Sequence, residues 1–427
     1  MSDLDAISYF TDPSLIGDPY PYFDRLRAQC PVRHDEHSGV VTVTGYDEAL
    51  AVYRDSESFS SCTSVIGPLA GLPFTPEGDD IGALIEQHRD QIPLSEHMVT
   101  FDPPQHTRAR GLLNRLITPK RLKENEEFMW RLAHRQLDEF IEAGHCEFLA
   151  DYAKPFATLV IADLLGVPEG DHKAFRSSLA ANTVGSVEES QNFVHNPLEF
   201  LDETFTTYIT ERRRAPRGDI LTLLAEAKYP DGSTPAVIDV VRLATFLFAA
   251  GQETTTKLLS AALRLVAERP ELQQLTRDDV SRIPILIEET LRIESPVKSD
   301  FRLVRTSTTI GDVELKAGQT VMILPGAANR DPRKFVDPNE FQLSRANARE
   351  QIAFGRGIHS CPGAPLARAE GRITVECFLR RAADIRISEA EHGPADARHY
   401  SYEPTYQLRG LTQLHLEFTP IERTSRG

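Results

Sequence analysis

Apolar and polar residues follow two different periods along this chain of 427 residues. Between residues 103 and 293 the pattern is helical, whereas beyond residue 300 short apolar runs are separated by Gly-Asp and Ala-Gly pairs, which are typical of tight turns between strands. The pattern predicts a mainly α protein with a minor antiparallel β-sheet. Because no linker-like stretch divides it, residues 1–427 are expected to form a single domain.

Two helix starts are marked by threonine followed by proline, a capping residue and then a proline at the first helical position. Thr118-Pro119 predicts a helix that ends at Gly144, a C-terminal stop. Thr234-Pro235 predicts a second helix that runs to about Arg269. That helix would be roughly 50 Å long at 1.5 Å per residue, enough to cross the whole domain.

Extended segments are expected at both ends of the chain, at residues 40–44, 301–310, 313–315, 320–324 and 411–418, with a helix from Asp47 after the first. Residues 60–100 are irregular and rich in glycine, proline and serine, with apolar side chains spread among them. A loop of this length inside a globular chain is usually functional or mobile. The segment is therefore a candidate for a functional role.

Composition narrows the class of protein. A hydrophobic content of 41% suffices for a large core, and the net charge of -16 argues against nucleic acid as a general partner. The longest strongly apolar run, residues 243–250, is far shorter than the roughly 20 residues that span a bilayer. The acidic N-terminus lacks the apolar region of a signal peptide. We therefore expect a soluble, cytoplasmic protein without a membrane anchor.

One of five scattered cysteines stands in a glycine-rich loop that runs into a helix, Phe354-Gly-Arg-Gly-Ile-His-Ser-Cys361-Pro-Gly-Ala-Pro-Leu-Ala-Arg368. A helix N-terminus carries partial positive charge, so a cysteine there loses its proton easily. Gly355, Gly357 and Gly363 let the backbone pack against something flat and bulky. A thiolate held against a flat cofactor suggests haem iron with a cysteine ligand.

Other interpretations of Cys361 are possible. A lone cysteine is most often a small core residue. A zinc site would need a further cysteine or histidine pair at tetrahedral spacing, which the chain does not offer. A Cys–His nucleophile would need a histidine placed to take the proton, and His359, two residues away in a tight loop, is badly aimed for that.

The long predicted helix contains Ala249-Ala250-Gly251-Gln252-Glu253-Thr254, a poor choice by helix propensity. The Thr254 hydroxyl can bond the carbonyl of Ala250 and bend the helix, which would open room for a small diatomic ligand and a water. Taken alone, the stretch is interpreted equally well as a crossing point for another helix.

The spacing F-G-x-G-x-H-x-C-x-G resembles the haem-binding loop of the cytochrome P450 family, and further motifs follow the family's order over nearly the whole chain. The resemblance implies the P450 fold, haem b (iron protoporphyrin IX) as cofactor and Cys361 as its metal ligand. Residues against the haem would be Ala250, Phe354, Gly355, His359 and Gly363. Its propionates would bind to His106 and Arg110, an H-x-x-x-R pair, to His359, and to Arg302, supported by Asp300.

The acid–threonine pair Glu253-Thr254 resembles the family's oxygen-activation motif, with glutamate in place of the frequent aspartate. In that family the threonine donates a hydrogen bond to dioxygen and the acid helps relay protons, so both residues are expected to be catalytic. A hydroxyl can hold water, and a carboxylate can gather protons from solvent. Pro362, after the cysteine, has no N–H to offer the sulfur, although Gly363 and Ala364 can still donate.

The resemblance also assigns a substrate pocket and a structural pair. Small or apolar residues would face a hydrophobic substrate, with segment 60–100 as its lid: Phe246, Ala249, Ala250 and Val297. Glu289 and Arg292, an E-x-x-R pair, would hold the haem-side core. Glu340 stands where the family often has a basic residue, and it could accept from Arg292.

The implied activity is that of a haem-thiolate monooxygenase, which inserts one oxygen atom from O2 into a hydrophobic substrate, as in the soluble bacterial members. Because no flavin or iron–sulfur domain follows Cys361, electrons would come from a ferredoxin and a ferredoxin reductase. Five basic residues would form the patch at which the electron donor docks, or would be ordinary surface charge: Arg108, Arg115, Lys120, Arg121 and Arg356. A peroxide-dependent peroxygenase and a non-catalytic haem sensor are the alternatives, and Glu253-Thr254 argues against both.

Overall fold

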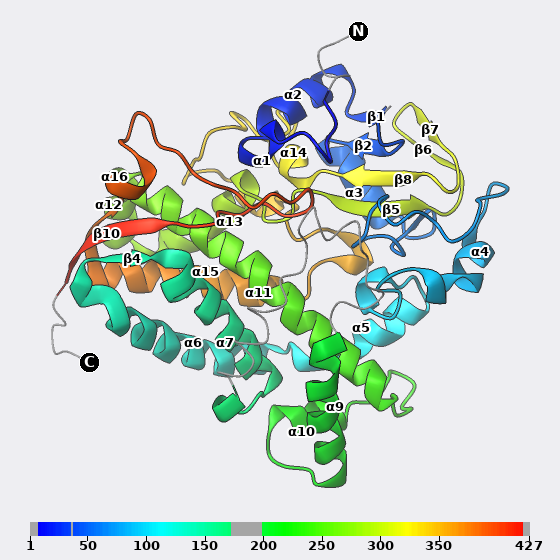
Figure 1. Ribbon diagram of the computed structural model, residues 1–427, viewed down its shortest axis with the longest axis horizontal. Helices are drawn as coiled ribbons and strands as arrows, with labels where there is room; N and C mark the ends of the chain where they lie inside the picture. Colours follow the sequence, from blue (N-terminus) through cyan, green and yellow to red (C-terminus); the bar gives the residue numbers. More distant parts are fainter. Residues whose placement is uncertain (1–6, 36, 172–198, 422–427) are drawn as a thin grey trace.

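One long helix, α11 (Val237–Ala267), runs diagonally through the structure, a computed structural model that describes residues 7–35, 37–171 and 199–421 (Figure 1). The helices packed around it are α7 (Lys154–Leu165), α9 (Glu199–Arg214), α13 (Ile283–Ile293) and α15 (Ala364–Arg381). Their apolar side chains form the largest core cluster, which contains Phe156, Phe205, Leu259 and Ile287.

The long helix begins two residues later than the Thr234-Pro235 signal predicts. The backbone N–H of Ala236 donates to the Asp239 carboxylate over 3.2 Å, so the acid at the third helical position supplies the acceptor that the threonine was expected to supply. The helix ends at Ala267, ahead of Pro270, which opens α12 (Pro270–Asp278).

The other predicted cap is confirmed in α6 (Pro119–Phe140). The hydroxyl of Thr118 accepts the N–H of Arg121 over 3.3 Å, and Gly144 adopts a left-handed conformation with φ of 73° after a short 3₁₀ turn. The remaining helices are shorter: α1 (Ser14–Gly17), α2 (Tyr20–Gln29), α3 (Tyr46–Arg54), α4 (Gly82–Gln87), α5 (Gln105–Leu116), α10 (Ile220–Ala225), α14 (Pro325–Ala328) and α16 (Glu389–His392). Residues 172–198, part of the stretch predicted to be helical, lie outside the described residues.

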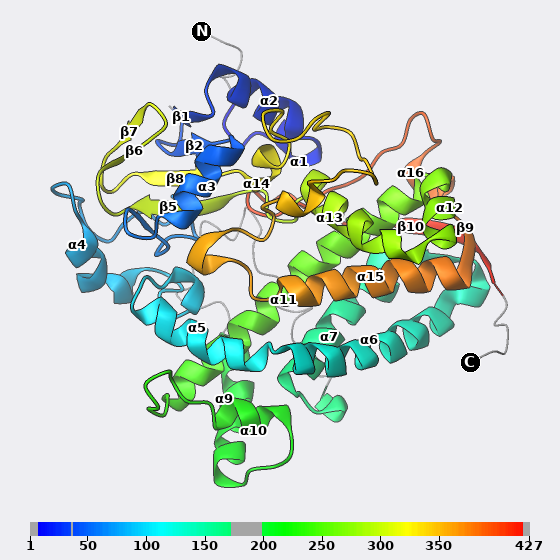
Figure 2. The ribbon, with the colours of Figure 1, turned by 180° about the vertical axis from the view of Figure 1, so that it is seen from behind.

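The main sheet lies at one end of the molecule, away from the bundle of α6, α7 and α15 (Figure 2). Its order is β1-β2-β8-β5-β3, formed by β1 (Val32–His34), β2 (Val41–Val43), β8 (Thr320–Ile323), β5 (Asp300–Val304) and β3 (Phe59–Ser60). The prediction of an antiparallel sheet is wrong for one pair, because β2 and β8 are parallel. These strands are far apart in sequence, and the helical part of the chain makes the long crossover that parallel strands require.

Two predicted strands differ most from the structure in their bounds, whereas 40–44 and 320–324 lose only one or two residues in β2 and β8. The run 301–310 is divided into β5 and β6 (Thr308–Ile310) because the chain between them turns to bond Ser58 and Asp79, and β6 pairs instead with β7 (Val313–Leu315). The run 411–418 becomes β10 (His415–Pro420), which lies between β4 (His145–Glu147) and β9 (Ala382–Ile387).

Segment 60–100 is irregular as predicted, apart from α4 and short 3₁₀ turns. It carries a small core cluster of its own that includes Cys62, Ile81 and Ile85. At its base the carboxylate of Asp102 accepts the Ser60 hydroxyl over 2.5 Å and the Ser61 N–H over 2.9 Å. Among the helices that the structure describes, none is long and apolar enough to cross a membrane.

Candidate active site

Cys361 lies between a 3₁₀ turn and the start of α15. Its N–H donates to the carbonyl of Phe354 over 2.8 Å and closes the loop. Gly357 has a φ of 72°, and a Cβ there would lie 2.0 Å from the carbonyl oxygen of Tyr53 in α3. Gly355 also has a positive φ, of 64°. Backbone conformation therefore requires both glycines, and Gly357 packs against α3 rather than against a flat group as predicted.

Cys361 is exposed to solvent, and neighbouring protein atoms nevertheless shift the pKa of its thiol. Burial raises that pKa, and the N–H groups of Gly363 and Ala364 and the guanidinium of Arg110 lower it without cancelling the rise. The prediction of an easily lost proton is therefore wrong for the free thiol, whereas coordination to a metal ion would deprotonate it outright.

Replacing Pro362 by leucine is expected to raise the reduction potential of the bound haem slightly. The new N–H would add a third donor beside those of Gly363 and Ala364, and donors to a ligating sulfur tune the iron potential. A contribution of about 0.5 kcal/mol corresponds to about 20 mV for one electron. A redox titration measures the shift, and Pro362→Ala, which adds the same N–H without the larger side chain, should reproduce it. An unchanged potential in both variants contradicts the expectation.

The predicted propionate ligands come together beside the cysteine loop. His106 of α5 and His359 lie with ring centroids 4.1 Å apart, and the neighbouring Arg110 donates to the Ser360 carbonyl over 2.8 Å. Arg302 of β5 is buried and pairs with Asp300 over 2.9 Å, which confirms the expected support.

These groups form a site that favours an anion. Burial, followed by Arg110, lowers the pKa of His106 to about 4, and burial, followed by Arg302 and His106, lowers that of His359 to about 2. Within the described residues the buried Nε2 of His106 has no hydrogen-bond partner. A buried polar atom needs one, and a carboxylate such as a haem propionate would supply it. The residues therefore fit haem. His359 already bonds the Phe101 carbonyl over 3.0 Å through Nε2, so its role toward a propionate stays a prediction.

The oxygen-side motif adopts the predicted geometry. The Thr254 hydroxyl donates to the carbonyl of Ala250 over 2.8 Å. Ala250 is exposed although it lies in the middle of α11, and Phe246, Ala249 and Glu253 are partly buried. The helix is therefore uncovered at Ala250, whereas a Cβ at Gly251 would lie 3.5 Å from Ile161 of α7, so on that side the stretch is also a crossing point for another helix.

Segment 60–100 reaches α11 close to these residues. The ring of His97 lies 5.6 Å from that of Phe246, and Glu96 pairs with Arg242 over 2.8 Å. Val297 forms a bridge with Leu408 of the C-terminal hairpin, residues 402–411. No local pattern in the sequence predicts that Leu408 lies beside Val297, because only this long-range pairing brings the two residues together.

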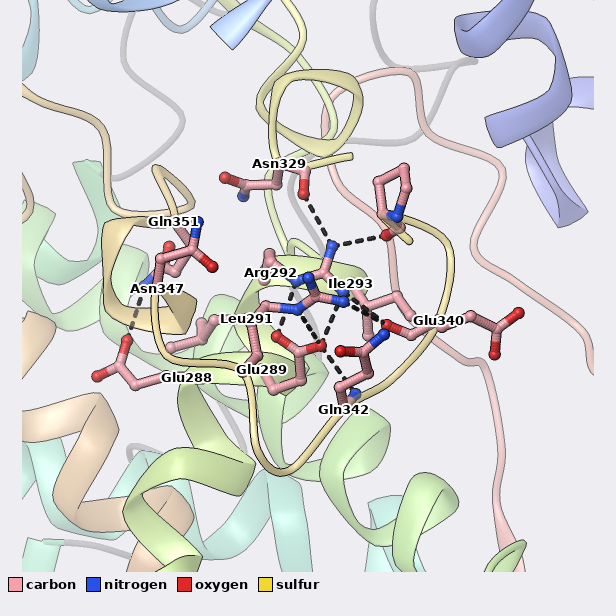
Figure 3. A network of polar contacts seen from close by, with 12 residues as sticks. Glu288, Glu289, Leu291, Arg292, Ile293, Asn329, Glu340, Gln342, Asn347 and Gln351 are labelled. Atoms are coloured by element: carbon pink, nitrogen blue, oxygen red, sulfur yellow. Dashed lines mark hydrogen bonds and ion pairs between the residues drawn. The ribbon is translucent and has the colours of Figure 1, made fainter. Parts of the chain in front are cut away.

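The E-x-x-R pair forms the centre of a buried network (Figure 3). Arg292 and Glu289 make two parallel hydrogen bonds of 2.8 Å and are both fully buried. The same guanidinium donates to the carbonyls of Asn329 over 3.0 Å, Pro338 over 2.6 Å and Glu340 over 2.9 Å. All five donors of the arginine are thereby engaged in a fixed geometry.

The third member of this network is Arg345, which the sequence analysis missed. Its Nε donates to Glu289 over 2.8 Å, and its other nitrogens bond the carbonyls of Val336, Asp337 and Glu340. Glu340 accepts through its backbone, as its exposed side chain takes no part. The signal was in the run Phe341-Gln-Leu-Ser-Arg345, whose arginine comes five residues after Glu340, the position where a basic residue was expected.

The helix that carries the pair also fixes both ends of the cysteine loop. Glu288 of α13 is buried and accepts from Gln351, ahead of the loop, over 3.1 Å. It also accepts from Arg368, behind the loop in α15, over 2.5 Å. The loop that presents Cys361 is thus held at both ends by one side chain.

The predicted docking cations do not form one free patch. Arg108 lies 3.9 Å above a tyrosine ring of the α10–α11 connection, Arg121 is mostly buried and bonds a carbonyl of α7, and Arg356 bonds carbonyls of its own loop. Lys120 has an exposed side chain at 86%, and the side chain of Arg115 lies outside the described part of the structure.

Comparison with known proteins identifies similar chains. A family model described as Cytochrome P450 matches residues 175–382, which include Glu253, Thr254 and Cys361. Cytochrome P450 144 of Mycobacterium tuberculosis is 34% identical, over 90% of this chain and 87% of its own. The substrate-free structure of Mycobacterium marinum cytochrome P450 CYP150A6 is 61% identical, with a TM-score of 0.93 over 98% of this chain and 100% of that one. CYP109E1 from Bacillus megaterium, solved in complex with testosterone, is 28% identical, with a TM-score of 0.78 over 94% and 99%.

Proposed function

The chain belongs to the cytochrome P450 family and is a haem-thiolate monooxygenase, and on this basis we propose that it inserts one atom of O2 into a hydrophobic organic substrate. The observation that carries the proposal is the acid–threonine pair on the uncovered part of α11. There the Thr254 hydroxyl is directed back to the Ala250 carbonyl over 2.8 Å. Peroxide-dependent relatives and a non-catalytic haem sensor would have no use for such a pair.

Each residue of the site has a defined task in this proposal. Haem b, held by Cys361, supplies the redox chemistry when bound. His106, Arg110 and Arg302 bind its carboxylates, and Gly363 and Ala364 donate N–H groups to the sulfur. The partly exposed carboxylate of Glu253 takes protons from solvent, and the Thr254 hydroxyl orients the water that receives them.

The substrate is proposed to lie against Phe246, Ala249, Ala250 and Val297, beneath segment 60–100. These side chains offer apolar contact and no charge, so a terpenoid, steroid or alkyl-aromatic molecule suits them. Because CYP109E1 was solved with testosterone, that steroid is the first probe. Binding is followed by the change in the Soret band when the compound is added.

Electrons are proposed to come from a ferredoxin and its reductase. Among the predicted docking cations, Lys120 has an 86% exposed side chain and a long ion pair of 3.9 Å to Glu124, so it can still meet an acidic partner. Arg108, Arg121 and Arg356 are bound more closely within the chain. Surrogate ferredoxin and reductase therefore serve in the assay, with NADH as the electron source.

The proposal is tested by replacing Thr254 with valine. Without the hydroxyl, protons are misdirected, so we expect product formed per NADH to fall about tenfold while hydrogen peroxide rises. Product, peroxide and NADH are measured together with testosterone or a better substrate found by the spectral screen. Thr256→Val is the matched control, because the Thr256 hydroxyl makes the same backward bond, to Gln252 over 3.0 Å, at a buried position.

Other outcomes would decide against the proposal. Wild-type turnover with peroxide alone, at the rate seen with NADH and both electron carriers, would favour the peroxygenase. Failure of the haem-loaded protein to oxidise any compound of an apolar library would favour the sensor.

A further inference from the structure

A buried lysine stands one helical turn after the proposed proton-relay acid. Lys257 follows Glu253 by four residues in α11, the spacing and order in which a glutamate and a lysine attract each other best. Its side chain is 4% exposed, in contrast to the 37% exposure of the Glu253 side chain. A buried ammonium is costly unless charged partners surround it, so Lys257 needs an explanation.

The partners of Lys257 are two carboxylates from different parts of the chain. Its Nζ lies 2.6 Å from the Glu403 Oε2 and 3.9 Å from the Glu253 Oε2. An ammonium has three donors and no acceptor, so one lysine can bridge two acids. The shorter contact fixes the ammonium, and the longer one allows it to limit where the Glu253 carboxylate lies.

The C-terminal hairpin holds this lysine in place. It belongs to the chain between α16 and β10, which passes alongside the helices in Figure 1. The N–H of Glu403 donates to the Gly410 carbonyl over 3.0 Å, which fixes the acid on the hairpin. A Cβ at Gly410 would lie 2.3 Å from the Lys257 Cγ, so the hairpin backbone packs directly on the lysine stem.

We propose that Lys257 is a positioning residue for the proton relay: anchored by Glu403, it holds the Glu253 carboxylate beside Thr254. The inference rests on the proposed function and deepens it, since it assigns two further residues to the same site. The same hairpin pairs through Leu408 with Val297, which is proposed to face the substrate. The lysine therefore connects the substrate side of the site to the relay acid.

The test compares Lys257→Met with Lys257→Arg in the haem-loaded enzyme. Methionine preserves the buried stem but removes the charge, so we expect product per NADH to fall about fivefold to tenfold, with more peroxide and a changed solvent deuterium isotope effect. Arginine retains the charge and should restore at least half of the coupling. Gly410→Ala displaces the ammonium without removing it, and should lower the coupling in the same direction.

Arg264→Met is the matched control. Arg264 is a buried cation of the same helix, 2.9 Å from Glu294. It comes eleven residues after Glu253, which is about 16 Å along the helix at 1.5 Å per residue. Its loss should lower the thermal midpoint and leave the coupling within twofold of wild type. If Arg264→Met uncouples the enzyme as strongly as Lys257→Met, the effect is one of general stability and the inference fails.

A readout independent of turnover separates this inference from the proposed function. The infrared stretch of carbon monoxide in the reduced, substrate-free enzyme responds to the electric field on the α11 side, so it should shift in Lys257→Met and Gly410→Ala but not in Arg264→Met. An unchanged stretch and unchanged coupling in both test variants would overturn the inference. If wild type forms no product, the proposed function fails, and the infrared shift alone decides the placement of Lys257.

Discussion

Replacing Cys361 by alanine is expected to abolish the strongly red-shifted Soret band that the reduced, carbon monoxide-saturated protein should show. That band reports a thiolate ligand. Two N–H groups, from Gly363 and Ala364, are directed at the sulfur of Cys361, and none of the four other cysteines of the sequence belongs to this loop. The nearby histidines can still bind the carboxylates of haem, so the haem content is expected to fall less than the intensity of the red-shifted band. Absorption spectra of matched samples measure both.

Cys377→Ala is the control for this experiment. Cys377 is fully buried in α15, the helix that Cys361 precedes, and within the described part of the chain its thiol makes no hydrogen bond to the cysteine loop. The variant should retain the red-shifted band at wild-type intensity per haem. A band of wild-type position in Cys361→Ala, or one typical of histidine ligation in wild type, would leave Cys361 as a structural residue.

Features of this site that depend on local spacing could be predicted from the sequence. The hydrogen bond from the Thr254 hydroxyl back to the Ala250 carbonyl follows from their spacing of four residues in a helix. The cap by Thr118 follows in the same way from its spacing of three residues from Arg121. The cysteine loop is similarly local, since its turns are imposed by glycines with positive φ, such as Gly357.

Features that depend on distant partners could not be predicted. The sequence shows the spacing of Glu253 and Lys257, but the Glu403 that anchors the lysine lies on a hairpin whose position only the tertiary structure gives. Arg345 was missed because a basic residue was expected at position 340, whereas the chain ahead of the cysteine loop brings an arginine from five residues further on to Glu289. The parallel pairing of β2 with β8 is a long-range contact of the same kind.

Replacing Arg292 by lysine is expected to destabilise the protein severely and to reduce haem incorporation. Lysine retains the charge but cannot make two parallel bonds to Glu289 and also reach the carbonyls of Pro338 and Glu340. The Pro338 carbonyl would then lack its donor, and the fully buried Glu289 carboxylate would keep only Arg345 and the Gln342 N–H. Breaking a buried pair costs about 3–5 kcal/mol. Thermal midpoint and haem content per protein are the measurements.

Haem should be lost together with stability because α13, the helix of Arg292, also holds the cysteine loop. Glu288, the neighbour of Glu289 in α13, holds Gln351 and Arg368 at the two ends of the cysteine loop. If the network around Arg292 relaxes, this helix loses its support and the loop loses both anchors together. Haem loss at a temperature below the unfolding midpoint would show that the loop is released first.

Arg333→Lys is the matched control for Arg292→Lys. Arg333 also bonds two acids, Glu48 and Asp331, but its own side chain is 49% exposed. Asp331 is buried and keeps the N–H groups of Tyr46 and Arg333 as donors, so the loss of stability should be smaller than in the fully buried network, and the control should retain full haem content. If the two variants prove equally stable and equally loaded, the buried network is not what holds the cysteine loop, and the case for Glu288 as its anchor falls with it.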